Sequence, residues 1–266
     1  PGSIKTIDRA AFYNCSGLKT LNLNEGLNTI YGQAFMGCPI TRLVIPNSVT
    51  NIYTYEYYST IHGAFEGCKS LTEIIIGDGL TNINLETFMG CSALKSIVIG
   101  SSVHTISDYA FANCSALVSI SNPDNVIIIG SNAFENCISL KTLNVGKSVQ
   151  TISSYAFRGC NSLSEIIFSE SVITIGSFAF ENCISLKKVV FEGTNCDIGY
   201  GAFKGCTGLT SIDLPKATEI GDSAFSGCTG LTSVTIPDSV TSIDYGAFED
   251  CTGLTSITIP DSVTSI

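Results

Sequence analysis

Apolar and polar positions recur along the chain with a period of 23 residues, which is the spacing of Cys91, Cys114 and Cys137. In register, the unit reads I-x-x-x-A-F-x-x-C-x-x-L-x-x-[ILV]-x-[ILVF]-x-x-x-V-x-x-I. The segments CTGLTSVTIPDSVTSI from Cys228 and CTGLTSITIPDSVTSI from Cys251 differ at one residue. One such unit cannot bury its own apolar face, so the pattern predicts a solenoid of about eleven stacked units.

Each unit contains elements that the pattern of side chains makes recognisable. The alternating segment L-x-x-I-x-I predicts a strand that stacks in parallel on its neighbours, with Ile257 and Ile259 facing inward in one unit. The Ala-Phe stretch before each cysteine, as in 107–111, predicts a short helical or 3-10 turn. The closing V-x-x-I, as in Val149 and Ile152, is compatible with a second short strand or an extended segment.

The residue before each repeat cysteine is always Gly, Asn or Asp, the residue types that best tolerate positive φ. We therefore expect a left-handed residue at the end of every turn. These positions are Asn14, Gly37, Gly67, Gly90, Asn113, Asn136, Gly159, Asn182, Gly205, Gly227 and Asp250.

Eleven of the twelve cysteines lie in this register, and Cys196 lies outside it. Cysteines of adjacent units would be close enough for disulfides. The large core favours the other interpretation, in which each thiol is a small buried hydrophobe. We expect free buried thiols in the column and consider Cys196 the one candidate for an accessible thiol. The chain has no CxxC pair and no Cys/His cluster, so we expect no zinc site.

Composition excludes several classes of protein. The chain has 266 residues, 44% of them hydrophobic, and its mean hydropathy is +0.34, which is too apolar for disorder. A net charge of −10 argues against nucleic acid as a partner. The chain has no run of 18 apolar residues, so no membrane-spanning helix is predicted. Its first residues do not resemble a signal peptide.

The sequence gives little evidence of a catalytic site or a calcium site. The two histidines, His62 and His104, occupy different places in the repeat and form no cluster with a nucleophile. Carboxylates such as Asp238 and Asp261 lack the ligand cluster that calcium requires. We therefore predict that the chain is not an enzyme and has no cofactor.

The outward residues of the strands are the first candidate site. Alternation exposes the middle position of each strand, which is variable along the array. Two apolar groups flanked by charges are candidate ligand-binding residues, although β-propensity at exposed positions explains them equally well. The first group is Val44, Ile75 and Val98 with Arg42 and Glu73, and the second is Ile167 and Val190 with Glu165 and Lys188.

An insertion between the second and third units is the second candidate site. Residues 53–59 form a predicted loop with Tyr53, Tyr55, Tyr57 and Tyr58. Tyrosines on a surface loop provide rigid, amphipathic contact area for a ligand. The alternative is that they fold back over a distorted junction between repeats.

The recurring phrase LTSITIPDSVTSI with A-F-x-x-C resembles the BspA-type leucine-rich repeat family over almost the whole chain. The match includes proline after several strands and departs from the pattern at Ser121, Asn122 and Pro123 and at Glu192 to Asp197. The resemblance implies a leucine-rich-repeat solenoid of the α/β type. It also implies secreted or surface-anchored bacterial or protist proteins that bind macromolecules of a host or neighbouring cell.

We therefore expect residues 1–266 to form a single solenoid that is a fragment of a longer protein. Its expected function is non-catalytic binding or adhesion, with a protein or glycan ligand held by the strand face and the insertion loop. The alternative is a structural spacer or an array that self-associates end to end without a specific ligand. The expected location, secreted or at the cell surface, follows from the resemblance alone.

Overall fold

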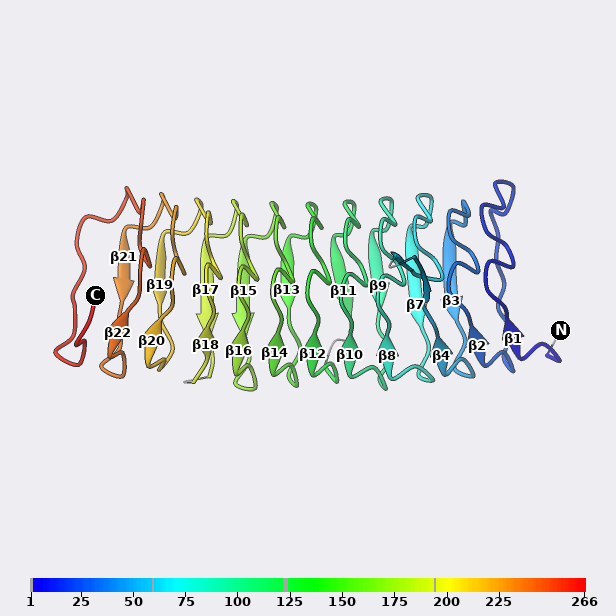
Figure 1. Cartoon of the computed structure of the whole chain (residues 1–266), viewed down its shortest axis with the longest axis horizontal. Coiled ribbons are helices and arrows are strands. Elements are labelled where there is room, and N and C mark those ends of the chain that lie inside the picture. The colour runs from blue at the N-terminus through cyan, green and yellow to red at the C-terminus, as the bar shows by residue number, and fades with distance from the viewer. Residues whose placement is uncertain (1, 59, 122–123, 194) are drawn as a thin grey trace.

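The computed structural model describes residues 2–58, 60–121, 124–193 and 195–266. It confirms the predicted parallel solenoid, in which the N- and C-termini lie at opposite ends of the stack (Figure 1). Most units contribute one longer and one shorter strand, and strands of each kind lie side by side along the stack (Figure 1).

The longer strands come from the segment L-x-x-I-x-I and form what we call the strand face. Burial alternates along them, as predicted, so that Leu43 and Ile45 face the core while Arg42 and Val44 face outward. These strands are β3 (Arg42–Ile45), β7 (Glu73–Ile76), β9 (Ser96–Val98), β11 (Ser119–Ser121), β13 (Thr142–Asn144), β15 (Glu165–Phe168), β17 (Lys188–Phe191), β19 (Ser211–Asp213) and β21 (Ser233–Thr235).

The sheet of the strand face is interrupted in two places within the described part of the chain. Strands pair in the orders β11-β9-β7-β3, β13-β15-β17 and β19-β21. The first interruption follows Ser121, and the second falls at the irregular stretch from Glu192 to Asp197. The predicted departures at Asn122 and Pro123 lie outside the described residues. Backbone pairing is thus lost where the sequence leaves the repeat.

The closing V-x-x-I segment forms a second series of parallel strands, each of two residues. They pair in the orders β1-β2-β4, β18-β16-β14-β12-β10-β8 and β20-β22. The strands are β1 (Thr6–Ile7), β2 (Thr29–Ile30), β4 (Asn51–Ile52), β8 (Asn82–Ile83), β10 (Thr105–Ile106), β12 (Ile128–Ile129), β14 (Thr151–Ile152), β16 (Thr174–Ile175), β18 (Asp197–Ile198), β20 (Glu219–Ile220) and β22 (Ser242–Ile243).

The Ala-Phe stretch, which we call the turn segment, is not helical, so the predicted helical turn is wrong: the described residues contain no helix. Left-handed residues interrupt most of these segments twice, at Tyr109 (φ 55°) and Asn113 (φ 62°) in one unit. Alternate N–H groups there donate within the segment and to the next unit. Phe111 donates to the carbonyl of Ala133 at 2.8 Å, whereas Cys114 donates to that of Phe111 at 3.2 Å. A helix would keep all these bonds internal.

The predicted left-handed residue before each cysteine is confirmed at all eleven positions, with φ between 53° and 73°. A second left-handed residue lies four positions earlier in most units, and here the chain uses bulky side chains such as Gln33, Tyr155 and Phe178. Bulky residues rarely adopt this conformation. Residue preference therefore predicted the left-handed residue before the cysteine but not the one that lies four positions earlier.

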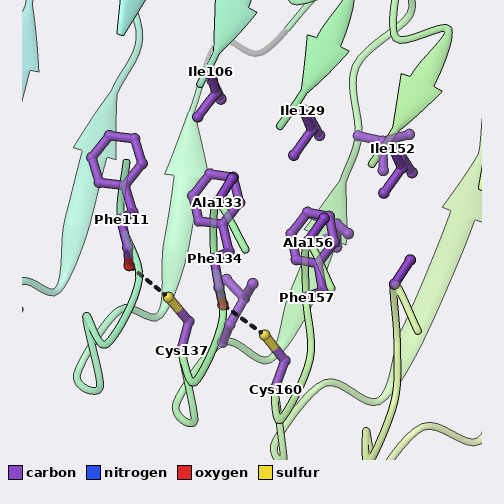
Figure 2. Packing of buried hydrophobic residues seen from close by; sticks show 14 of the residues in the cluster. Ile106, Phe111, Ile129, Ala133, Phe134, Cys137, Ile152, Ala156, Phe157 and Cys160 are labelled. Atoms are coloured by element: carbon purple, nitrogen blue, oxygen red, sulfur yellow. Dashed lines mark hydrogen bonds between the residues drawn. The ribbon is translucent and has the colours of Figure 1, made fainter. Parts of the chain in front are cut away.

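The core is built around a column of stacked phenylalanines. Neighbouring rings from Phe12 to Phe248 lie 5.2–5.5 Å apart between centroids, with interplanar angles of 16° or less. Rings between these two ends are fully buried (Figure 2). Each buried ring stabilises the fold by roughly 1.5–3 kcal/mol, and its ring contacts add about 0.5–1.5 kcal/mol.

The column of cysteines is tied to the phenylalanines by hydrogen bonds. Each thiol from Cys38 to Cys251 in the repeat register donates to the phenylalanine carbonyl of the preceding unit, at 2.9–3.4 Å. Figure 2 shows two of these bonds, from Cys137 to Phe111 and from Cys160 to Phe134. The cysteine therefore fills a small apolar position and also donates a hydrogen bond to a backbone carbonyl.

Cys196, the one candidate for an accessible thiol, is buried: it is 4% exposed and packs into the core. Cys15 is the exposed thiol of the described residues, since it belongs to the first unit of the stack. Burial raises the pKa of Cys114, Cys160, Cys196 and Cys228 to about 12. These thiols stay protonated at neutral pH and lack the reactive thiolate.

We predict that Phe134→Ala lowers the free energy of unfolding by about 3–5 kcal/mol, because it opens a cavity in the middle of the ring column. Phe12→Ala is the matched control. Its ring is 41% exposed, so the loss should be roughly 1–2 kcal/mol. Chemical denaturation followed by circular dichroism measures both. Equal losses for the two variants would contradict a continuous buried column.

We also predict that a thiol reagent labels Cys15 rapidly in the folded chain at mildly alkaline pH. The buried thiols should react only after unfolding, because they are both inaccessible and protonated. Mass spectrometry of labelled peptides identifies the sites, and Cys15→Ser should remove the fast phase. Rapid labelling of Cys196 in the native chain would contradict the structure.

Candidate functional site

The first predicted group of outward residues forms a continuous patch on the strand face. Parallel pairing places Val44 beside Ile75 and Ile75 beside Val98. Arg42 and Glu73 are paired in the same way, and Arg42 Nε lies 2.6 Å from Glu73 Oε2. Val44 is 38% exposed, and Ile75 and Val98 are half-buried. We call these five residues the first patch.

The second predicted group has the same arrangement on β15 and β17. Ile167 pairs with Val190, and Glu165 with Lys188, whose Nζ lies 2.7 Å from Glu165 Oε1. Ile167 is 44% exposed. We call these four residues the second patch. The cation lies on the N-terminal strand in the first patch and on the C-terminal strand in the second, so the order of charges is reversed.

Each patch borders a hollow that we did not predict from the sequence. The first hollow, of about 460 Å³, and the second, of about 480 Å³, both open on the strand face. Each contains an asparagine at the middle outward position, next to a branched residue of its patch. These pairs are Asn22 with Val44 and Asn144 with Ile167. The sequence contained a signal for these hollows, because the middle outward residue is asparagine in one unit and a branched apolar residue in the next unit.

The tyrosine insertion is a β-hairpin, not a loop. Strand β5 (Tyr55–Tyr57) pairs antiparallel with β6 (Thr60–His62), so that Tyr55 faces His62 and Tyr57 faces Thr60. The hairpin joins neither of the two series of parallel strands. Residue 59, at the end of the predicted loop, lies outside the described part of the chain.

Three tyrosines of the insertion divide between the solenoid and the solvent, while the side chain of Tyr57 lies outside the described part of the structure. The Tyr53 ring stacks on Tyr31 with centroids 5.2 Å apart, and the Arg9 guanidinium lies 4.0 Å from the Tyr55 ring centroid. Tyr58 is 85% exposed. Arg9 and Tyr31 follow the two-residue strands of their units, so the hairpin lies on the turn-segment side. It does not share a site with the patches on the strand face.

The base of the hairpin contains a small group of ionisable side chains. His62 Nδ1 lies 3.0 Å from Glu66 Oε2. Burial raises the pKa of Glu86, and the nearby Glu66 carboxylate raises it further, while His62 lowers it. Asn84 also bridges this junction, because its Nδ2 donates to the Ile52 carbonyl at 2.6 Å where β4 and β8 do not pair.

The remaining candidate chemistry is dispersed over the molecule. His62 is engaged with Glu66, and His104 is exposed in another unit. No three His, Cys, Asp or Glu side chains within 2–58, 60–121, 124–193 and 195–266 are arranged to hold a metal ion. Over the same residues, none of the secondary structure is a helix with the length and apolarity to cross a membrane.

Comparison with protein families gives one match, which extends over the chain. The model of the BspA type leucine rich repeat region matches in six copies, over residues 1–62, 59–164 and 150–266. No curated protein matches the chain.

Two solved structures, those from Bacteroides ovatus and Eubacterium ventriosum, show the same fold. A leucine-rich repeat protein from Bacteroides ovatus is 28% identical, with a TM-score of 0.67 over 100% of this chain and 76% of that one. A leucine-rich repeat protein from Eubacterium ventriosum is 23% identical, with a TM-score of 0.55 over 91% and 78% of the two chains. A leucine rich cell surface protein from Faecalibacterium prausnitzii is 25% identical, with a TM-score of 0.45 over 90% and 85%.

We predict that Glu86→Gln raises the thermal midpoint at neutral pH. A carboxyl group whose pKa is raised by folding stabilises the fold below its unfolded pKa of about 4.3, and that contribution is lost as pH rises through the folded pKa. The gain from Gln should therefore vanish in acid. The exposed Glu219 is the control, and Glu219→Gln should leave the midpoint nearly unchanged. A gain that persists below the unfolded pKa would contradict this origin.

Proposed function

Since this chain belongs to the BspA-type leucine-rich repeat family, we propose that it is a non-catalytic binding module of a secreted or cell-surface protein. The strand face is the proposed contact surface for a macromolecular ligand. Its exposed apolar patches, each flanked by an ion pair, are the observation that carries this proposal.

The composition of the two patches supports a protein ligand. Specific protein interfaces have an apolar centre and a polar rim, and exposed aliphatic groups beside charges provide both. The ion pairs of Arg42 with Glu73 and of Lys188 with Glu165 are already formed without a ligand. They hold the charged side chains beside the apolar residues, so less conformational entropy is lost when a partner binds.

The tyrosine hairpin is a second proposed contact surface. Tyr53 and Tyr55 are fixed by Tyr31 and Arg9, and the exposed Tyr58 lies at the turn of the hairpin. Because the hairpin lies on the turn-segment side, a ligand that touches both surfaces must wrap around the edge of the solenoid. Otherwise the two surfaces serve separate partners.

We predict that Val44→Ser combined with Ile75→Ser weakens ligand binding by about tenfold or more, because removal of apolar groups at an interface centre costs at least 1 kcal/mol. A protein array and a glycan array are screened with the chain, and the strongest hit is titrated by surface plasmon resonance. Thr235→Ala, an outward change on β21, is the control.

Unchanged binding to that hit would reject the first patch as the contact surface. A screen in which only glycans bind would reject the protein ligand. If the chain captures only itself, a self-associating spacer replaces the binding module as the function.

A further inference from the structure

The two hollows on the strand face are built from the same positions of the repeat. Both contain the same five positions of one unit, 20–24 in the first hollow and 142–146 in the second, and the same two outward positions of the next unit. The rest of the lining differs, with Lys19 and Thr41 in the first hollow and Lys147, Ser169 and Glu192 in the second. The outward residues of the next unit are Arg42 and Val44 in the first hollow and Glu165 and Ile167 in the second. The hollows are therefore equivalent in construction, five units apart.

Three chemical groups are common to both hollows. A threonine hydroxyl comes from Thr20 or Thr142, and an asparagine amide lies two residues later. A branched apolar side chain, Val44 or Ile167, borders the amide. Charge is not common, because the outward residue before the branched one is Arg42 in one hollow and Glu165 in the other. A ligand that fits both is recognised by hydrogen bonds and apolar contact, not by its charge.

The relation between the hollows constrains the shape of such a ligand. Parallel strands in neighbouring units lie about 4.8 Å apart, so five units separate the hollows by about 24 Å along the stack. Both hollows have the same orientation, because their strands are parallel and in register with those of the next unit, and the units repeat along the stack, across the strands. A ligand that engages both must present the same group twice in the same direction.

Resting on the proposed function, we infer that the two hollows are equivalent subsites that hold one extended, uncharged polypeptide segment at two points. An asparagine amide both donates and accepts hydrogen bonds, as a peptide group does. An apolar side chain of the segment contacts Val44 in one hollow and Ile167 in the other. Extended chain rises about 3.3 Å per residue and its side chains alternate between two faces, so two side chains that point in the same direction across this distance are about eight residues apart.

The charges around the hollows agree with an uncharged segment. Arg42 and Glu165 are both paired with side chains of the following strand, Glu73 and Lys188. The other charged lining residues, Lys19 in the first hollow and Lys147 and Glu192 in the second, occupy different positions of the repeat, so the two hollows do not offer the same charge at an equivalent position. The net charge of −10 also disfavours an acidic segment. No residue that lines either hollow within the described chain is aromatic, so neither hollow provides a ring on which a sugar could stack.

The test uses the whole chain and synthetic peptides of Ser and Thr that carry leucine once, twice about eight residues apart, or twice about four residues apart, so that both leucines lie on one face of the extended peptide. Biolayer interferometry measures the affinity for each. We expect the widely spaced peptide to bind about 100-fold more tightly than the single one, since its second contact is intramolecular. The closely spaced peptide cannot span the hollows and should bind like the single one.

Variants assign that gain to the two hollows. Val44→Ser and Ile167→Ser should each reduce the affinity for the widely spaced peptide to that for the single peptide. Both residues are exposed on strands, and circular dichroism checks that the variants fold. Thr235→Ala on β21, outside both hollows, should retain the full gain.

Equal affinity for the single and widely spaced peptides, or loss of all binding in one variant alone, would overturn the two-point inference. Failure of every peptide to bind, or preferential binding of neutral oligosaccharides, would also overturn it. The proposed function fails in a different outcome, in which substitutions on the strand face leave the affinity for the hit from the protein array unchanged. If that hit still depends on Val44 and Ile75 while the peptides show no gain, only the inference is wrong.

Discussion

The hydrogen bond from each phenylalanine N–H to the next unit is the constraint on which the rest of the structure depends. From Phe12 to Phe225, each of these groups donates to the carbonyl of the residue before the next phenylalanine, at 2.8–3.0 Å. The bond fixes the register of neighbouring units, and that register stacks the rings and places each thiol beneath a carbonyl. Left-handed residues make the bond possible, because they turn alternate N–H groups out of the segment.

This ladder explains why the strand face can vary. Both series of strands lose pairing between unit neighbours, at β17 and β19 on one face and at β18 and β20 on the other. The turn segments across the same junction remain bonded, as from Phe180 to Ala202. Because one side of each unit holds the stack together, outward residues on the other side are free to form patches and hollows. The contacts that hold the stack together and the surface proposed to bind a ligand thus lie on different sides of the solenoid.

Much of the fold was predictable because the unit recurs within one chain. Recurrence marked the inward positions of the strands, the cysteine column and the left-handed residue at Asn113 and its equivalents. The helical turn was wrong for a local reason: an N–H that donates within its segment and one that donates to the next unit have the same sequence signature. The burial of Cys196 was not predictable because it lies outside the register, yet its side chain still reaches the core.

For the candidate site, strand alternation fixes the direction of each side chain, so the order of residues was enough to tell which residues face outward and which of them are apolar. The folded chain was needed to show that Arg42 reaches Glu73, that Asn22 and Asn144 border equivalent hollows, and that the tyrosine insertion is a hairpin on the turn-segment side. These features depend on the register between units 22 or more residues apart and on contacts such as Tyr53 with Tyr31. Local periodicity contains no information about either.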